Sequence, residues 1–291
     1  MLVERTLSVQ NVSVHLREWG SGGMPIVFWH ALGDHSSMQM AEVGPILVGE
    51  YGLRVIGIDA PGFGGSAPRL RDSQYEVPTL TVFIANLVDA LELNRPAWVG
   101  SSWGAHLGVA FAATHPEDVR AVVLLDGGYF ADPDEPLLSL SLEALREQER
   151  ALPEYRWPSW DAAFAEYREW AGGRWSAELE GYVRSVMREE GDEVVSIMGP
   201  DVFAAGLYGL LHADLADAQE RLGRTGLPVL LLAAARTDFP ELEEQRELSL
   251  QHFQSRIPLA EVRRIGAPHL MLEAQPNEVA EIIGPWLRRH A

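Results

Sequence analysis

Five short apolar runs recur along the chain, and they constrain its fold more than any other feature. Each run has the length of a β-strand and shows no polar alternation, a pattern typical of strands buried on both faces. The runs are "PIVFWH" (25–30), "RVIGID" (54–59), "AWVGS" (97–101), "VRAVVLLD" (119–126) and "PVLLLAA" (228–234). Helical patterns such as "TVFIANLVDALEL" (81–93) separate them. Alternating strands and helices predict a mostly parallel sheet that is flanked by helices.

The two ends of the chain extend this sheet. "TLSVQ" (6–10) and "VSVHLREW" (12–19) alternate apolar and polar residues, which predicts an N-terminal hairpin. "LAEVRRI" (259–265) reads as a last strand and "PNEVAEIIGPWLRR" (276–289) as a closing helix. With the five buried runs, these segments predict a sheet of eight strands.

The strand pattern stops between residues 127 and 227. This stretch is rich in acidic residues and holds amphipathic helical segments such as "SWDAAFAEYREW" (159–170), but no convincing buried strand. We therefore expect a core made of residues 1–126 and 228–291, with residues 127–227 inserted as a helical cap.

Composition excludes several classes of function. The net charge of −19 would repel a nucleic-acid backbone. The sequence has no cysteine and no lysine, so thiolate, Schiff-base and P-loop lysine chemistry are ruled out. No apolar run approaches the ~18 residues of a membrane span, and the N-terminus lacks the pattern of a signal peptide. We expect a cytoplasmic protein that acts on a small molecule, without metal or organic cofactor, as a monomer or a dimer.

The pentapeptide "GSSWG" (100–104) lies between a predicted strand and a predicted helix. This is the context that the G-x-S-x-G nucleophile elbow requires. Glycines allow a sharp turn that exposes Ser102 at the carboxyl end of the strand, and the N-terminus of the following helix favours negative charge. We therefore predict that Ser102 is a nucleophile rather than a turn residue.

A serine hydroxyl needs a base, and the base needs a carboxylate that orients it. His269 lies in the loop between the last strand and the last helix, whereas His252 falls within a helical pattern and His290 at the terminus, so we predict His269 as the base. Two acids follow strands at the same edge of the sheet. Asp238 comes after the strand that follows the insertion and is our first choice, and Asp126, which ends the strand before the insertion, is the alternative.

The tetrahedral intermediate needs two hydrogen-bond donors about 3 Å from its oxyanion. We predict the N–H groups of Trp103 and Leu32, with that of Ala31 as the alternative to Leu32. His30 precedes this loop and fits a buried residue that fixes it, while Asp34 and His35 are candidates for lining the pocket or for solvated turn positions.

Five segments in this order resemble the α/β-hydrolase family: "FWHALGDH" (28–35), "DAPGFGGS" (59–66), "GSSWG", "VRAVVLLD" and "APHLMLEAQPNEVAEII" (267–283). The resemblance covers about residues 1–126 and 228–291. It implies the α/β-hydrolase fold, with a cap inserted after the sixth strand of the sheet.

Two positions depart from the family pattern. Ala31 stands where glycine is usual, and Trp103 follows the nucleophile, as it does in haloalkane dehalogenases and epoxide hydrolases. Those enzymes use an aspartate nucleophile where this chain has Ser102, so acyl transfer is favoured over halide displacement or epoxide opening. The resemblance implies a carboxylesterase-like serine hydrolase. A C–C bond hydrolase, a lactonase or an aminopeptidase would use the same triad, and a weakly catalytic ligand receptor is the alternative of another class.

Overall fold

A computed structural model describes residues 2–67, 69–130, 136–152, 155–235 and 242–290. The described residues form an eight-stranded sheet with the order β1-β2-β4-β3-β5-β6-β10-β11. β1 pairs antiparallel with β2 and β2 antiparallel with β4, and all other pairs are parallel. The eight-stranded, mostly parallel sheet predicted from the sequence is confirmed. Its strands are β1 (Leu2–Val9), β2 (Val12–Trp19), β3 (Pro25–Trp29), β4 (Arg54–Ile58), β5 (Ala97–Ser101), β6 (Ala121–Leu125), β10 (Val229–Ala234) and β11 (Glu261–Ile265).

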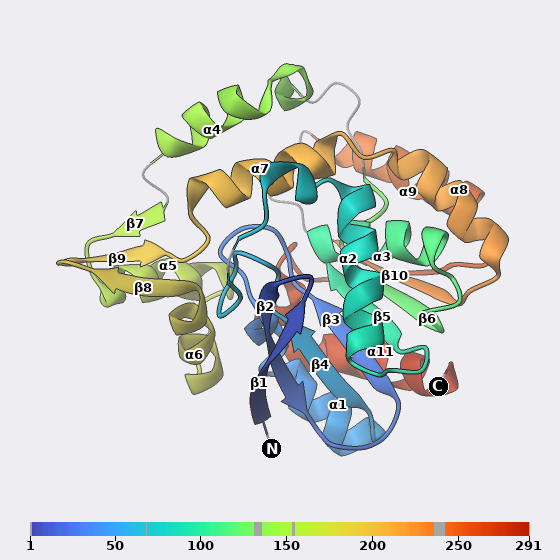
Figure 1. Ribbon diagram of the computed structural model, residues 1–291. Helices are drawn as coiled ribbons and strands as arrows, with labels where there is room; N and C mark the ends of the chain where they lie inside the picture. Colours follow the sequence, from blue (N-terminus) through green and yellow to red (C-terminus); the bar gives the residue numbers. More distant parts are fainter. Residues whose placement is uncertain (1, 68, 131–135, 153–154, 236–241, 291) are drawn as a thin grey trace.

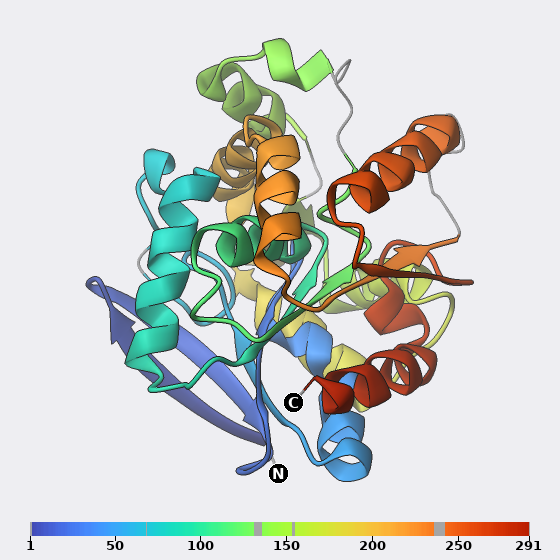
Figure 2. The same ribbon diagram turned by 90° about the vertical axis from the view of Figure 1, so that its right-hand side faces the viewer.

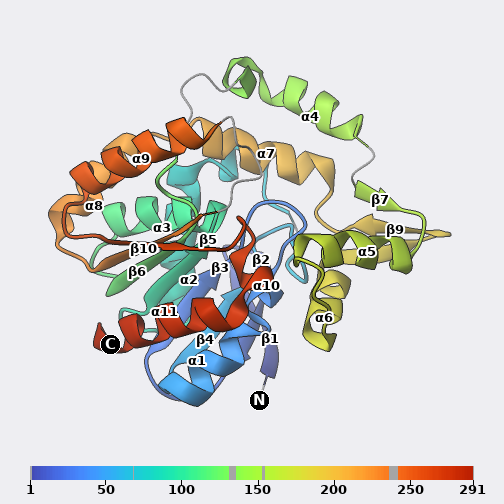
Figure 3. The ribbon, with the colours of Figure 1, turned by 180° about the vertical axis from the view of Figure 1, so that it is seen from behind.

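Helices cover both faces of this sheet (Figures 1 and 3). One face packs on α2 (Val77–Ala90), α3 (Trp103–Thr114), α8 (Leu215–Thr225) and α9 (Glu243–Arg256), and the other on α1 (Val43–Tyr51) and α11 (Pro276–Arg289). Successive residues of one strand alternate between the two cores: Val122 and Leu124 join the first, and Val123 and Leu125 the second. Burial of both sets explains why the central strands are continuously apolar.

The insertion between β6 and β10 forms a cap beside the carboxyl edge of the sheet (Figures 1 and 2). Its helices are η3 (Pro136–Ser139), α4 (Leu142–Arg150), α5 (Trp160–Trp170), α6 (Ala177–Val186) and α7 (Gly199–Leu211). Residues 127–227, in which no convincing buried strand was expected, also contain three short strands. β7 (Arg156–Trp157), β8 (Met187–Glu190) and β9 (Glu193–Ser196) form a small antiparallel sheet of order β7-β9-β8. Strands of two to four residues are too short for periodicity to detect.

The predicted range of the cap, residues 127–227, includes α8 (Leu215–Thr225). α8 packs on α3, and its Leu215 and Leu222 belong to the core on that face of the sheet. The helix therefore serves as the crossover that returns the chain to β10. Within the part of the chain that the structure describes, we find no helix whose length and apolar character would let it cross a membrane.

Candidate active site

Ser102 lies at a sharp turn between β5 and α3, where it is the residue that precedes the helix. Its φ of 50° and ψ of −105° are strained for a non-glycine residue. The flanking glycines make the turn sterically feasible. A Cβ on Gly100 would lie 2.1 Å from the carbonyl oxygen of Gly104, and one on Gly104 would lie 2.2 Å from that of Trp29. The strain is therefore built in by close backbone packing, and the N-terminus of α3 points at the serine.

Asp126 and His269 form a hydrogen-bonded pair next to this turn. His269 Nδ1 lies 2.7 Å from Asp126 Oδ2, and Asp126 directly follows β6, the neighbour of β5. The backbone N–H of Ser102 donates to the carbonyl of Leu125 at 2.8 Å, which fixes the serine beside the acid. The carboxylate that the structure places against His269 is thus Asp126, the alternative in the sequence prediction. Asp238, our first choice, lies outside the described residues.

The Asp126 carboxylate is held on both oxygens. Its Oδ1 accepts hydrogen bonds from the Ala234 N–H at 2.9 Å, the Tyr129 hydroxyl at 3.0 Å and the Arg246 guanidinium at 3.2 Å. Burial alone would raise the pKa of Asp126, but the hydrogen bond with His269, the Ala234 N–H and the charge of Arg246 together hold it below the usual value. Asp126 is therefore an ionised, fixed acceptor for a proton on His269 Nδ1.

The loop after β3 carries the predicted oxyanion donors, and its hydrogen bonds distinguish between them. The Ala31 N–H donates to Gln39 Oε1 at 2.9 Å in a fully buried contact. This donor is already engaged, so Leu32 is the better candidate for the second N–H beside that of Trp103. We call residues 30–33 the oxyanion loop.

His30 fixes the peptide that bears the Leu32 N–H. Its Nε2 accepts from the Ala60 N–H at 3.0 Å, so the ring proton is on Nδ1 and donates to the Ala31 carbonyl at 2.6 Å. Burial lowers the pKa of His30 to about 4, which keeps the ring neutral near pH 7. Because C=O and N–H point in opposite directions in a trans peptide, anchoring the Ala31 carbonyl aims the Leu32 N–H the other way.

A cavity of about 1290 Å³ lies between the oxyanion loop, the His269 loop and the cap. His269 and Leu32 line it from the core, and Asp34 and His35 do so as well, whereas His30 and Ala31 are buried. Four of its lining side chains are carboxylates, and no Arg is found among its described lining residues. The carboxylates are Asp34, Glu149, Glu166 and Glu169.

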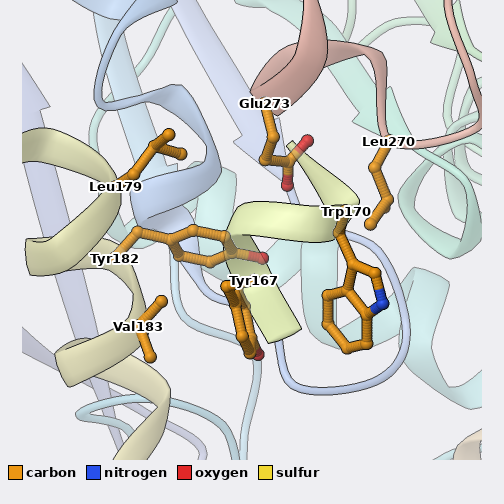
Figure 4. Close-up of a pocket in the computed structure, with 7 residues that line it drawn as sticks. All are labelled: Tyr167, Trp170, Leu179, Tyr182, Val183, Leu270 and Glu273. Carbon is orange, nitrogen blue, oxygen red and sulfur yellow. The ribbon is translucent and has the colours of Figure 1, made fainter. Parts of the chain in front are cut away.

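The cap closes tightly on the core next to this cavity. The hydroxyl of Tyr167 donates to the Asp34 carbonyl at 2.7 Å, and that of Tyr182 is hydrogen-bonded to His35 Nδ1. Figure 4 shows the carboxyl group of Glu273 directed toward the hydroxyl end of Tyr182, with Trp170 beside it. The space that remains there is only about 10 Å³, room for no more than one water molecule.

Sequence reasoning did not identify the residues that hold the catalytic groups in place. Arg246 and Tyr129 fix Asp126, and Gln39 fixes the oxyanion loop. None of the three belongs to a short motif, and each contact joins segments that only the fold brings together. The burial of Gln39 is visible only in the folded chain, so the sequence carries no signal for these contacts.

Comparison with known proteins agrees with this architecture. The family model described as "alpha/beta hydrolase fold" matches residues 24–172, just over half of the 291 residues. The chain belongs to the α/β hydrolase fold family. The recognition made from the five motifs is thereby confirmed.

Individual relatives share either a limited identity or a limited length with this chain. The chain is 33% identical over 121 residues to a 2-hydroxy-6-oxononadienedioate/2-hydroxy-6-oxononatrienedioate hydrolase of Paraburkholderia xenovorans, which covers 40% of each protein. It is 26% identical over 291 residues to a poly(3-hydroxyalkanoate) depolymerase of Ectopseudomonas oleovorans, covering 98% of this chain and 92% of that protein. Several relatives that match at 30–36% identity are spanned over only 32% to 41% of their own length.

Solved structures extend the similarity of fold to the whole chain. The structure of E-2-(acetamidomethylene)succinate hydrolase superposes with a TM-score of 0.79 at 22% identity, over 99% of both chains. At this level of identity the likeness concerns the fold and leaves the substrate open.

Proposed function

We propose that the protein is a serine hydrolase that cleaves a carboxylic ester, or a similar acyl bond, of a small molecule through a Ser102–His269–Asp126 triad. The observation that carries the proposal is the strained serine at the elbow beside Asp126, which directly follows the neighbouring strand β6 and is hydrogen-bonded to His269. An elbow whose glycines are sterically required costs stability, and such strain is typical of functional sites.

In this mechanism His269 Nε2 takes the proton of Ser102 as its Oγ attacks the substrate carbonyl. The imidazolium that forms is stabilised by Asp126. This carboxylate stays ionised because the charge of Arg246 and the hydrogen bond from the Ala234 N–H stabilise its negative charge. The developing oxyanion accepts hydrogen bonds from the N–H groups of Leu32 and Trp103. His269 then protonates the leaving alcohol. In the second half of the reaction His269 takes a proton from water, the resulting hydroxide attacks the acyl-enzyme, and His269 returns the proton to Ser102 as the acid product leaves.

The acidic lining of the cavity favours neutral or cationic substrates. The relative named as a hydrolase of 2-hydroxy-6-oxononadienedioate acts on a dicarboxylate, and C–C bond cleavage is the second candidate that the shared fold and triad support. Two carboxylates of such a substrate would face those of Glu149, Glu166 and Glu169 here, at an electrostatic cost that grows with burial. We therefore place an uncharged ester ahead of a dicarboxylate diketone.

The test is Ser102→Ala, measured on a panel of p-nitrophenyl esters together with labelling by a fluorophosphonate probe. We expect the wild-type protein to turn over at least one ester and to be labelled at Ser102. Ser102→Ala should lose labelling and lower turnover by about 10³-fold or more. Retention of wild-type turnover in Ser102→Ala would refute the mechanism, and a wild-type protein that is neither labelled nor active would favour the ligand-receptor alternative.

A further inference from the structure

We propose that Gln39 and Glu273 form a buried strut that sets the orientation of the oxyanion loop, and that Arg174 of the cap holds the base of this strut. Both residues are therefore positioning residues for the reaction proposed above, on which this inference rests. Neither side chain contacts the cavity that holds His269.

The strut consists of two consecutive buried hydrogen bonds. Gln39 Oε1 accepts from the Ala31 N–H at 2.9 Å, and Gln39 Nε2 donates to Glu273 Oε1 at 2.7 Å. The amide orientation is not arbitrary, because a backbone N–H can only donate and a carbonyl oxygen must therefore face it. The exposed fractions are 3% for Gln39 and 4% for Glu273, so water does not compete for either contact.

The strut joins the oxyanion loop to the short helix that follows the His269 loop. Ala31 directly precedes Leu32, the proposed oxyanion donor, and Glu273 lies in α10 (Met271–Ala274), four residues after His269. Burial raises the pKa of Glu273, although the Gln39 amide opposes this effect. A shift of either loop along this strut would change the distance between the oxyanion donor and the base.

Arg174 of the cap binds the Glu273 end of the strut. Arg174 lies between α5 and α6, donates through Nη1 to the backbone carbonyl of Glu273 and forms an ion pair at 2.9 Å with Glu42. Glu42 directly precedes α1 and follows the short helix η1 (Ser37–Met40) that carries Gln39. One cap side chain therefore joins the core segments that carry the two ends of the Gln39–Glu273 contact.

The physical consequence is a loss that appears in the transition state. Without Gln39 the Ala31 N–H and Glu273 would both be left buried without this partner, so the loop would shift to regain hydrogen bonds. Ground-state binding in a cavity of about 1290 Å³ depends little on that shift, whereas the oxyanion forms only during reaction. We therefore expect kcat to fall and KM to stay nearly constant.

The decisive experiment compares Gln39→Met with the reversed pair Gln39→Glu/Glu273→Gln. Gln39→Met keeps the side-chain length and removes both hydrogen bonds, and should lower kcat on a p-nitrophenyl ester by about 10- to 100-fold. In the reversed pair a carboxylate accepts from the Ala31 N–H and an amide donates to it, so kcat should return to within about threefold of wild type. The rate of fluorophosphonate labelling of Ser102 should follow the same order.

Ser36→Ala is the matched control. The hydroxyl of Ser36 is buried next to η1, where it hydrogen-bonds Ser185 of the cap at 2.7 Å and caps the Met38 N–H. The substitution removes these two bonds but keeps the Ser36 carbonyl, which accepts from the Gln39 N–H at 3.1 Å, and it leaves the two hydrogen bonds of the strut in place. The variant should lose stability with little change in kcat. If Gln39→Met does not fold, Gln39→Asn, which is too short to reach both partners, replaces it.

The proposal is overturned if folded Gln39→Met keeps the wild-type kcat and labelling rate, if the reversed pair does not recover, or if Ser36→Ala loses kcat equally. Failure of the proposed function looks different, because it would abolish Ser102 labelling in the wild-type protein or make Ser102→Ala active.

Discussion

The carboxyl edge of the sheet and the cap are built by different means. At the sheet edge the backbone sets the geometry: Ser102 and Asp126 have positive φ angles of 50° and 43°, and the glycines around them have no room for a Cβ. In the cap, side chains set the geometry through hydrogen bonds between distant segments, such as Ser196 with Asp34 and Tyr182 with His35. Backbone geometry is coded locally and tolerates few substitutions, whereas side-chain contacts can be exchanged. The comparison predicts that changes at the sheet edge abolish chemistry and that changes in the cap alter selectivity or stability.

The largest effect should come from Asp126→Asn. The three donors around Oδ1 would hold the amide oxygen in its place, so the NH2 group would face His269 Nδ1. The imidazole would then favour the wrong tautomer and lose its charge stabilisation. We expect kcat on an activated ester to fall by about 10³- to 10⁴-fold. The measurement is steady-state kinetics, with circular dichroism to confirm that the fold is retained.

Asp238→Asn completes this test, because Asp238 was the acid favoured by the sequence. If Asp126 is the triad acid, Asp238→Asn should retain kcat within about threefold, as expected of a substitution outside the reacting groups. The opposite ranking of the two variants would transfer the role to Asp238 and contradict our assignment.

A smaller effect is expected from the charge of the cavity. Glu169 lines the cavity from the cap, and Glu169→Gln removes one of its four carboxylates. In a partly solvated cavity, the repulsion between one carboxylate of the protein and one of the substrate is about 1 kcal/mol. In Glu169→Gln, kcat/KM for an ester with a carboxylate tail should therefore rise about fivefold relative to that for its neutral analogue. This change should shrink in 1 M salt.

An electrostatic role for the cavity would be contradicted if the ratio of kcat/KM for the charged ester to kcat/KM for the neutral ester were the same in wild type and in Glu169→Gln. It would contradict the division between core and cap if Glu169→Gln lowered kcat on both esters equally. An exposed cap acid such as Asp192 offers the control substitution, Asp192→Asn, for which the ratio should not change.

Most of the fold could be predicted from the sequence because its signals are local. Both-face burial makes β5 and β6 continuously apolar, and the elbow needs glycine at positions 100 and 104 whatever the rest of the chain does. The short strands β7, β8 and β9 could not be predicted, since two to four residues carry no measurable period. α8 was assigned to the cap because its amphipathic pattern does not say which apolar surface its Leu215 and Leu222 contact.

The candidate site divides in the same way. Ser102, His269 and the loop that bears Leu32 follow from motif and order, while the choice between two acids depends on which strand end lies nearer the histidine. Asp126 follows β6 and His269 follows β11, and β10 lies between these strands in the sheet, so neither sheet order nor a local pattern contains their contact. Gln39 and Glu273 are 234 residues apart in the chain, so their contact is equally invisible in the sequence.

The last prediction concerns stability rather than turnover, and it tests the cap–core contact most directly, through Asp34. Burial raises the pKa of this carboxyl to about 7, against a hydrogen bond from Ser196 Oγ that lowers it, and the charge of Glu166 adds to the rise. The folded state thus retains a proton that the unfolded state loses near pH 4. Stability therefore falls as the pH rises from about 4 to about 7, and the full penalty is present above pH 7.

Asp34→Asn removes this titration and keeps an oxygen that can accept the bond from Ser196. The variant should be more stable than wild type at pH 8, by at most about 4 kcal/mol for a shift of this size. Because Asp34 is partly exposed to the cavity, we expect a gain of a few degrees in Tm at pH 8 that nearly vanishes at pH 4.5. Thermal unfolding at both pH values measures it. A gain that is independent of pH would mean that Asp34 is ionised without cost, and that the cap does not desolvate the edge of the site as the structure implies.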